Sequence, residues 1–139
     1  MTLAEFNKQY PNYYKKGRNG NKYKAQKALL DGHNFDSISE GNLYAELKLQ
    51  QRAGIIKSFD IQVKEEMYAY GKFICNYYVD FLIFHLDGTK EFTEHKGIPT
   101  ETWRLKWKML LAKYHDQILR GEVKCSIDWC KPKYKFKLK

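Results

Sequence analysis

The stretch that decides the fold runs from residue 73 to residue 96 and reads FICNYYVDFLIFHLDGTKEFTEHK. It is rich in aromatic and β-branched residues, which favour strands. The Asp87-Gly88 pair near its middle is typical of a hairpin turn. The sequence therefore predicts two strands, near residues 73–85 and 90–96, that pair as an antiparallel hairpin.

Two acidic residues and a lysine stand at corresponding places in these strands. Alternate residues of a strand share a face, so Glu94 and Lys96 project together while His95 points away. The length of the loop decides whether Asp80 joins them. A two-residue loop would place Asp80 opposite His95, on the wrong face. A three-residue loop, with Gly88 in the left-handed region as a bulge, would place Asp80 opposite Glu94.

The three-residue loop would bring two carboxylates and one ammonium together. Two carboxylates on adjacent strands can hold a Mg²⁺ ion that keeps several waters and a phosphate oxygen. Such an ion acidifies a bound water and offsets charge that builds on a phosphate. The ammonium of Lys96 could orient that water and stabilise the developing charge. The alternative is a surface cluster in which Lys96 merely pairs with a carboxylate, because an Asp followed by Glu-x-Lys is a permissive pattern.

Upstream of this hairpin, the pattern changes from strand to helix and back. A strand, bent or broken, is expected near residues 55–70. A helix is expected before it, because Ser37 and Glu40 form a capping-box pattern and Gly54 provides a stop. Glu40 shares the apolar face of this helix, so it points inward or toward a cleft. A short hairpin around an Asp-Gly turn is expected at residues 28–35.

Downstream, Pro99 opens a second helix whose apolar residues recur at helical spacing. They are Trp103, Trp107, Leu110, Leu111 and Tyr114. A last strand is expected at residues 123–129. The resulting order, αβββαβ, predicts an α/β (α+β) fold with a central mixed sheet flanked by helices.

Charge divides the chain into three parts. We expect a basic arm rich in Tyr and Lys at residues 1–27, a core at 28–130 and a basic tail at 131–139. The net charge of +9 and the pI near 9.4 indicate a polyanionic partner, with nucleic acid first and an anionic membrane surface second. The side chains expected to contact DNA are Lys15, Lys16, Arg18, Lys22, Lys24, Lys106, Lys131, Lys133 and Lys135.

The sequence favours a protein of the cytoplasm that does not enter membranes. Its start lacks the pattern of a secretory signal, and no apolar stretch approaches the roughly 20 residues that span a bilayer. The three cysteines are expected to be reduced thiols. Cys125 and Cys130 could suit a metal by spacing, but ordinary strand and turn roles are the favoured interpretation.

Several blocks of the sequence resemble an uncharacterised phage nuclease-like family, domain of unknown function 1064. The likeness covers roughly residues 30–115. More distantly, the blocks are similar to the phage junction-resolving endonuclease I, and both families belong to the PD-(D/E)XK nuclease superfamily. One departure is Val79, where members of the superfamily often carry Pro before the first carboxylate. The blocks are FDSISE at 35–40, LYAELK at 43–48, YVDF at 78–81, EHKG at 94–97 and TETWRLK at 100–106.

The resemblance implies a restriction-endonuclease-like core and a role for each site residue. Asp80, Glu94 and the backbone carbonyl of His95 would bind Mg²⁺, for which Mn²⁺ could substitute. Lys96 would be the catalytic lysine, and Glu40 a further carboxylate for this metal or a second one. The implied function is a DNA endonuclease of a phage or mobile element that nicks or cuts branched DNA, as a monomer or a homodimer. The alternatives are a DNA-binding module that has lost catalysis and an RNA-binding protein.

Overall fold

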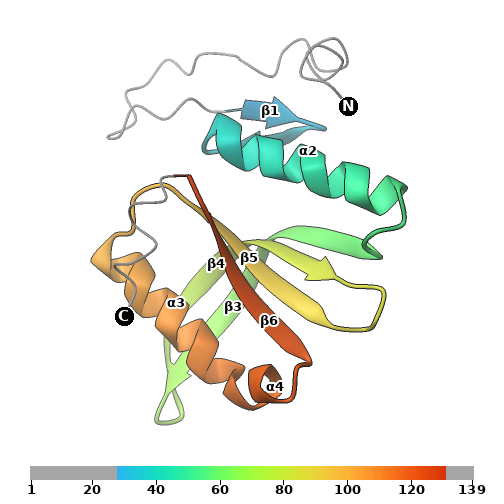
Figure 1. Cartoon of the computed structure of the whole chain (residues 1–139). Coiled ribbons are helices and arrows are strands. Elements are labelled where there is room, and N and C mark those ends of the chain that lie inside the picture. Colours follow the sequence, from blue (N-terminus) through green and yellow to red (C-terminus); the bar gives the residue numbers. More distant parts are fainter. Residues whose placement is uncertain (1–27, 131–139) are drawn as a thin grey trace. The chain divides into compact units, whose positions relative to one another are not determined.

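A computed structural model describes residues 28–130 of the protein (Figure 1). These residues divide into two compact units, one up to residue 48 and one from residue 49 onward, and each is described by itself. The first unit contains the short strands β1 (Ala28–Leu30) and β2 (His33–Phe35) and most of helix α2 (Ile38–Arg52). The second contains the sheet and the helices α3 and α4.

The first unit is a hairpin followed by a capped helix, as the sequence predicted. Asp31 and Gly32 have φ of 50° and 78°, which matches the two-residue turn expected of an Asp-Gly pair. The backbone N–H of Glu40 donates to Ser37 Oγ at 3.1 Å, which confirms half of the capping box. The hydroxyl of Tyr44, a buried residue of α2, donates to Asp31 Oδ2 at 2.9 Å. This bond ties the helix to the turn of the hairpin.

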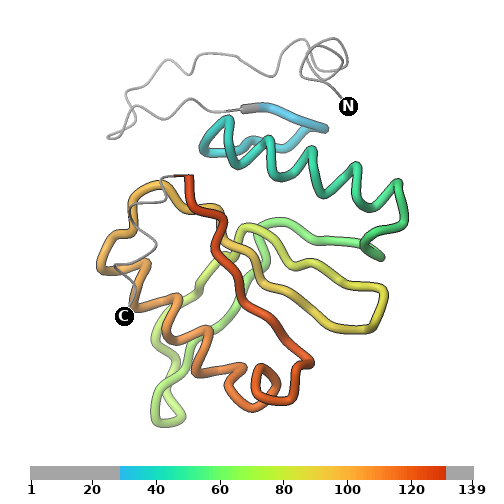
Figure 2. The backbone as a smooth tube through the Cα atoms, in the orientation of Figure 1, coloured from blue at the N-terminus to red at the C-terminus, as the bar shows by residue number. Residues whose placement is uncertain are grey.

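The second unit is built on a four-stranded mixed sheet. Its strands are β3 (Ser58–Ala69), β4 (Lys72–Phe84), β5 (Lys90–Lys96) and β6 (Val123–Trp129), in spatial order β3-β4-β5-β6. The pairs β3–β4 and β4–β5 are antiparallel, and β5–β6 is parallel because two helices return the chain between them. β3 and β4 form a long ribbon whose turn projects past the end of β5 (Figure 2). The expected fold class and strand bounds are confirmed to within a few residues.

The loop between β4 and β5 has the predicted three-residue form. Gly88 has a φ of +88°, and its N–H donates to the carbonyl of His85 at 3.1 Å. The N–H of His85 in turn donates to the carbonyl of Thr89 at 2.9 Å. The ladder then runs down to the pair Phe81 and Thr93, in the register that carries Asp80 toward Glu94.

The helices after β5 differ in two details from the expectation. Thr100, rather than Pro99, caps α3 (Glu101–Lys113), since its hydroxyl accepts from the N–H of Trp103. The short helix α4 (His115–Leu119) was not predicted, because five residues are too few to show a helical period. No helix within residues 28–130 is both long and apolar enough to cross a membrane.

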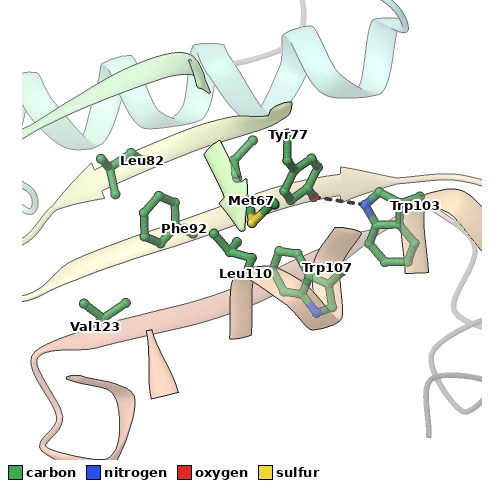
Figure 3. Packing of buried hydrophobic residues seen from close by; sticks show 9 residues of the cluster. Met67, Tyr77, Leu82, Phe92, Trp103, Trp107, Leu110 and Val123 are labelled. Carbon is green, nitrogen blue, oxygen red and sulfur yellow. Dashed lines mark hydrogen bonds between the residues drawn. The ribbon is translucent and has the colours of Figure 1, made fainter. Parts of the chain in front are cut away.

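Helix α3 packs its apolar stripe against one face of the sheet (Figure 3). Trp103, Trp107 and Leu110 are buried against Met67, Tyr77, Val79, Leu82, Phe92 and Val123 from all four strands. Burying one large side chain of this kind contributes about 1.5–3 kcal/mol. This cluster therefore fixes α3 on the sheet, close to the ends of the strands that carry the candidate site.

Candidate active site

Asp80 and Glu94 lie next to each other on neighbouring strands, and each carboxylate accepts a backbone N–H from the other strand. The N–H of Asp80 donates to Glu94 Oε2 at 3.2 Å. The N–H of His95, the residue after Glu94, donates to Asp80 Oδ2 at 2.9 Å. The predicted juxtaposition of the two carboxylates is therefore present in the structure.

These two carboxyl groups are unfavourably placed for carrying two negative charges. Glu94 is only 5% exposed, and burial, followed by the charge of Asp80, raises its pKa to about 8. Asp80 is half-buried, and burial also raises its pKa, although the hydrogen bond from the N–H of His95 opposes that rise. Two adjacent carboxyl groups with raised pKa are typical of sites that bind a proton or a cation. A divalent cation bound by Asp80 and Glu94 would offset the negative charge of both carboxylates.

Lys96 is the nearby cation, and it lies on an aromatic ring. Its Nζ is 4.9 Å from the centre of the Trp103 ring, a distance typical of a cation–π contact. Its positive charge lowers the pKa of both Asp80 and Glu94. None of the ion pairs formed within residues 28–130 involves Lys96. The ammonium is thus near both carboxylates without forming an ion pair with either of them.

His95 contributes its backbone to the site and directs its ring elsewhere. Its Nδ1 is 2.9 Å from Oδ2 of Asp128, the residue paired with it in the parallel strand β6. This agrees with the alternation that placed the His95 side chain opposite to Glu94 and Lys96. The proposed role of its carbonyl as a metal ligand stays a prediction.

Gln62 is a member of the site that the sequence did not reveal. Its amide Nε2 donates to Asp80 Oδ1 at 3.0 Å, so Asp80 is held from β3 as well as from β5. Gln62 has a φ of +48° within a strand, where a residue other than glycine is strained. Val79 and Leu82 both enter the core next to this distortion, so the regular alternation of β4 is interrupted between these two residues. No local sequence signal marks a left-handed Gln.

Tyr77 is a second member of the site that was missed. It is buried, its hydroxyl accepts from Trp103 Nε1 at 3.1 Å (Figure 3), and the nearby charge of Glu94 adds to the effect of burial in raising its pKa. In the sequence, Tyr77 lies two residues before Val79 in the same strand, a spacing that indicates only a core residue. A search for a polar group on that apolar face would have singled it out.

The remaining predicted residues divide into those that the structure describes and those that it does not. Glu40 is buried in α2, within the first unit, and its role toward the metal stays a prediction. Lys106 is half-buried on α3. The other predicted DNA contacts lie outside the described residues: Lys15, Lys16, Arg18, Lys22, Lys24, Lys131, Lys133 and Lys135.

The residues present fit a magnesium ion better than a softer metal. Within residues 28–130 there is no group of three or more His, Cys, Asp and Glu side chains that could hold a metal. Mg²⁺ commonly uses one or two carboxylates and keeps several of its waters. A softer metal would need thiolates, but burial raises the pKa of the Cys125 thiol to about 11. Asp80 and Glu94 therefore supply a donor set that suits Mg²⁺.

Comparison with known proteins assigns this arrangement to a family. The family model described as "protein of unknown function (DUF1064)" matches residues 20–129, which include every element from β1 to β6. The chain belongs to this family. No curated protein and no solved structure matches it. In this DUF1064 protein, the matched range contains Asp80, Glu94, Lys96, Gln62 and Tyr77.

Proposed function

We propose that this DUF1064 protein is a Mg²⁺-dependent DNA endonuclease of the PD-(D/E)XK type. The observation that carries the proposal is the pair of carboxylates, half-buried Asp80 and buried Glu94, held side by side by backbone N–H groups with the Lys96 ammonium nearby. Burying like charges is costly in a fold that gains nothing from them. A cation bound by both would remove that cost and supply the chemistry of phosphodiester hydrolysis.

In this mechanism each residue has a defined task. Asp80, Glu94 and the carbonyl of His95 would hold Mg²⁺, which acidifies a bound water and polarises the scissile phosphate. Gln62 keeps Asp80 in place through Oδ1 and leaves its other lone pairs for the ion. Lys96 orients the attacking water and stabilises the charge that develops on the phosphate. Glu40 is an additional candidate carboxylate.

DNA is the favoured substrate because of the charge of the chain. The net charge of +9 favours a polyanion, and the lysines of the arm and the tail would neutralise phosphates on either side of the cut. One site per chain would nick one strand, whereas a homodimer could cut both strands or resolve a junction. We favour nicking or branched-DNA cleavage, inside the host cell of a phage or mobile element.

Supercoiled plasmid with Mg²⁺ tests the proposal. We expect the wild-type protein to form open circles, and Asp80→Ala to form none while still binding DNA. Asp60→Ala is the matched control, because Asp60 is an exposed aspartate of β3 and its removal changes the net charge equally. Full activity in Asp80→Ala would contradict the site.

Two other outcomes would select the alternatives. DNA binding by the wild-type protein without cleavage in Mg²⁺ or Mn²⁺ would indicate a binding module that has lost catalysis. Metal-independent binding with a preference for RNA would indicate an RNA-binding protein.

A further inference from the structure

We propose that the face of the β3–β4 ribbon that points away from α3 is a stacking surface for unpaired DNA bases beside the cleavage site. The inference rests on the proposed endonuclease function and specifies which part of a DNA substrate the protein recognises. The observation that carries it is the position of the exposed aromatic rings. Within residues 28–130 all of these rings belong to this ribbon or its turn, and they are Tyr68, Tyr70, Phe73 and Tyr78.

Three of the rings lie on one face of the ribbon, and their contacts define that face. Tyr68 of β3 pairs with Phe73 of β4, and the two ring centres are 5.8 Å apart. Tyr78 pairs with Lys64, whose ammonium is 3.9 Å from Glu66 Oε1. The Tyr68 hydroxyl donates to Glu66 Oε2 at 3.0 Å. These contacts place Lys64, Glu66 and Tyr68, which are alternate residues of β3, on the same face as the rings of β4.

The opposite face of the ribbon belongs to the core. Met67 and Tyr77 are buried in the cluster that packs against α3 (Figure 3). They precede Tyr68 and Tyr78 in the sequence, so the alternation of a strand turns Tyr68 and Tyr78 away from α3. Each ring on that outer face is more than half exposed. Single exposed apolar residues are common, whereas a group of them indicates an interaction site.

The turn of the ribbon contains a tyrosine in a strained conformation. Tyr70 and Gly71 have φ of 52° and 75° and connect the paired residues Ala69 and Lys72. A two-residue turn of this kind favours Asn, Asp or Gly, because φ is positive at both positions. Tyr70 is also fully exposed, so no packing within the described residues offsets its strain. A residue that is strained and unpacked fits a role toward a partner.

The aromatic face begins beside the candidate active site. Tyr78 lies two residues before Asp80 on β4, and Lys64 lies two residues after Gln62, the residue of β3 that donates to Asp80. With a rise of about 3.4 Å per residue, Tyr78 is about 7 Å along the strand from Asp80, and Phe73 is about 17 Å further. A stacked DNA strand rises about 3.4 Å per nucleotide, so the face spans about five nucleotides.

Unpaired DNA is the partner that this face fits. Bases of every kind stack on aromatic rings, and the net charge of +9 attracts the phosphates between them. The face is only two strands wide, with the strands about 4.8 Å apart, which suits one nucleic-acid strand. Bases within a duplex are stacked on each other and must leave the stack before they can contact a ring. A fork or branch supplies unpaired bases next to a duplex, which agrees with branched DNA as the favoured substrate.

Five variants test the face. Tyr78→Ala and Phe73→Ala each remove a ring, whereas Tyr78→Phe keeps the ring. Tyr70→Asn removes the ring at the turn and supplies a residue that suits positive φ, so it should not lower the melting temperature. Leu119→Ala is the matched control, because Leu119 is an exposed apolar residue of the short helix α4 and lies outside the ribbon.

The experiment measures binding and cleavage separately. Fluorescence anisotropy in EDTA, at several salt concentrations, gives the affinity for a short labelled DNA strand, for its duplex and for RNA of the same sequence. Cleavage of forked DNA with Mg²⁺ gives the DNA concentration for half-maximal cutting and the turnover at saturating DNA. Melting curves show that each variant is folded, and sedimentation velocity gives the oligomeric state.

We expect Tyr78→Ala, Phe73→Ala and Tyr70→Asn each to weaken the binding of single-stranded DNA about tenfold, the effect of losing one stacked base, and to leave duplex binding unchanged. The salt dependence should stay that of the wild-type protein, because the rings neutralise no phosphate. Tyr78→Phe and Leu119→Ala should bind as the wild-type protein does. Phe73→Ala and Tyr70→Asn should raise the half-maximal concentration of forked DNA and leave turnover at saturation unchanged.

Equal losses for single-stranded and duplex DNA would overturn the proposal, because the ribbon would then lie in a groove of the duplex. Tighter binding of RNA than of DNA through the same rings would also overturn it. A wild-type dimer that Phe73→Ala converts to a monomer would make the face an interface between copies of the chain. Failure of the proposed function looks different, because a wild-type protein that cuts no DNA would still show, in EDTA, whether the rings bind single strands.

Discussion

Two buried glutamates lie on the same sheet, and the fold treats them in opposite ways. Glu65, on β3, forms an ion pair with Lys113 and accepts a hydrogen bond from the Tyr114 hydroxyl at 2.8 Å. Glu94, on β5, is equally buried but lies beside Asp80, whose charge opposes its ionisation. One carboxylate has its counter-charge within the fold, whereas the other has a second carboxylate.

The difference separates a structural carboxylate from a functional one. Removing one partner of a compensated buried pair leaves an unpaired charge, so the Glu65 cluster should matter for stability. Asp80 and Glu94 have only the one ammonium of Lys96 nearby, so together they cost stability, and a bound cation would offset that cost. Burial alone therefore does not identify a site, and the charge environment of the buried group does.

The largest expected effect compares the two glutamates in catalysis. Glu94→Ala should lower cleavage at saturating DNA by about 10³-fold or more, because it removes a metal ligand. Glu65→Ala should lower the melting temperature but leave turnover per folded molecule within about threefold of wild type. Plasmid nicking, corrected for folded fraction by circular dichroism, measures both. If Glu65→Ala reduced turnover as completely as Glu94→Ala, the two carboxylates would not differ in function.

Two lysines on β5 offer the next comparison. Lys96→Ala should lower turnover about 10²-fold with little change in DNA affinity, because its ammonium acts on charge that develops during the reaction. Lys90 also lies over an aromatic ring, 5.9 Å from the centre of Phe84, but at the opposite end of the strand. Lys90→Ala should leave turnover unchanged. A Lys96→Ala variant that loses only affinity would make Lys96 a phosphate anchor.

The glutamates should also differ in the sign of their effect on stability. Without Mg²⁺ at pH 7.5, Glu65→Gln should lower the free energy of unfolding by about 1–3 kcal/mol, because it weakens the pair with Lys113. Glu94→Gln should raise it by about 1–3 kcal/mol, because burial, followed by the charge of Asp80, disfavours the ionised glutamate in the folded protein, whereas a glutamine carries no charge in either state. Urea unfolding of both variants measures the two values. A Glu94→Gln variant that is less stable than the wild-type protein would show that the two glutamates do not differ in their effect on stability.

The stability that Glu94→Gln gains over the wild-type protein should depend on pH in a definite direction. The pKa of Glu94 is raised in the folded state from 4.5 to about 8, so the folded protein binds its proton more tightly than the unfolded chain. The wild-type protein therefore loses stability as the pH rises from about 4.5 to 8. The advantage of Glu94→Gln should grow over the same window and be small at pH 4.5. An advantage that does not vary with pH would exclude charge as its cause.

The smallest effects are expected from the basic ends of the chain. Deleting residues 1–27 or 131–139 should weaken DNA binding and flatten its dependence on salt, by about 0.9 in the log–log slope for each phosphate that the deleted lysines had neutralised. Cleavage at saturating DNA should survive, because Asp80, Glu94 and Lys96 all lie in the second unit. Fluorescence anisotropy at several salt concentrations provides the test. An unchanged slope would show that the deleted segment does not touch DNA.

The sequence by itself placed the central hairpin and narrowed its register to two loop lengths. Gly88, with its freedom to adopt positive φ, allowed the three-residue loop, and the two-residue period of strands then carried Asp80 to Glu94 and separated His95 from Lys96. The capped start of α2 and the aromatic stripe of α3 could also be predicted from the sequence. All of these depend on neighbours within a few residues, or on one short loop.

Only the tertiary structure decided what surrounds those residues. The strained backbone of Gln62, its bond to Asp80, and the ring of Trp103 that joins Tyr77 to Lys96 connect elements far apart in the chain. The charge environment that distinguishes Glu94 from Glu65 arises in the same way. The period of a strand or helix predicts which face of the element a side chain lies on. Its partners on that face depend on the packing of strands and helices that are distant in the sequence, and no local pattern encodes that packing.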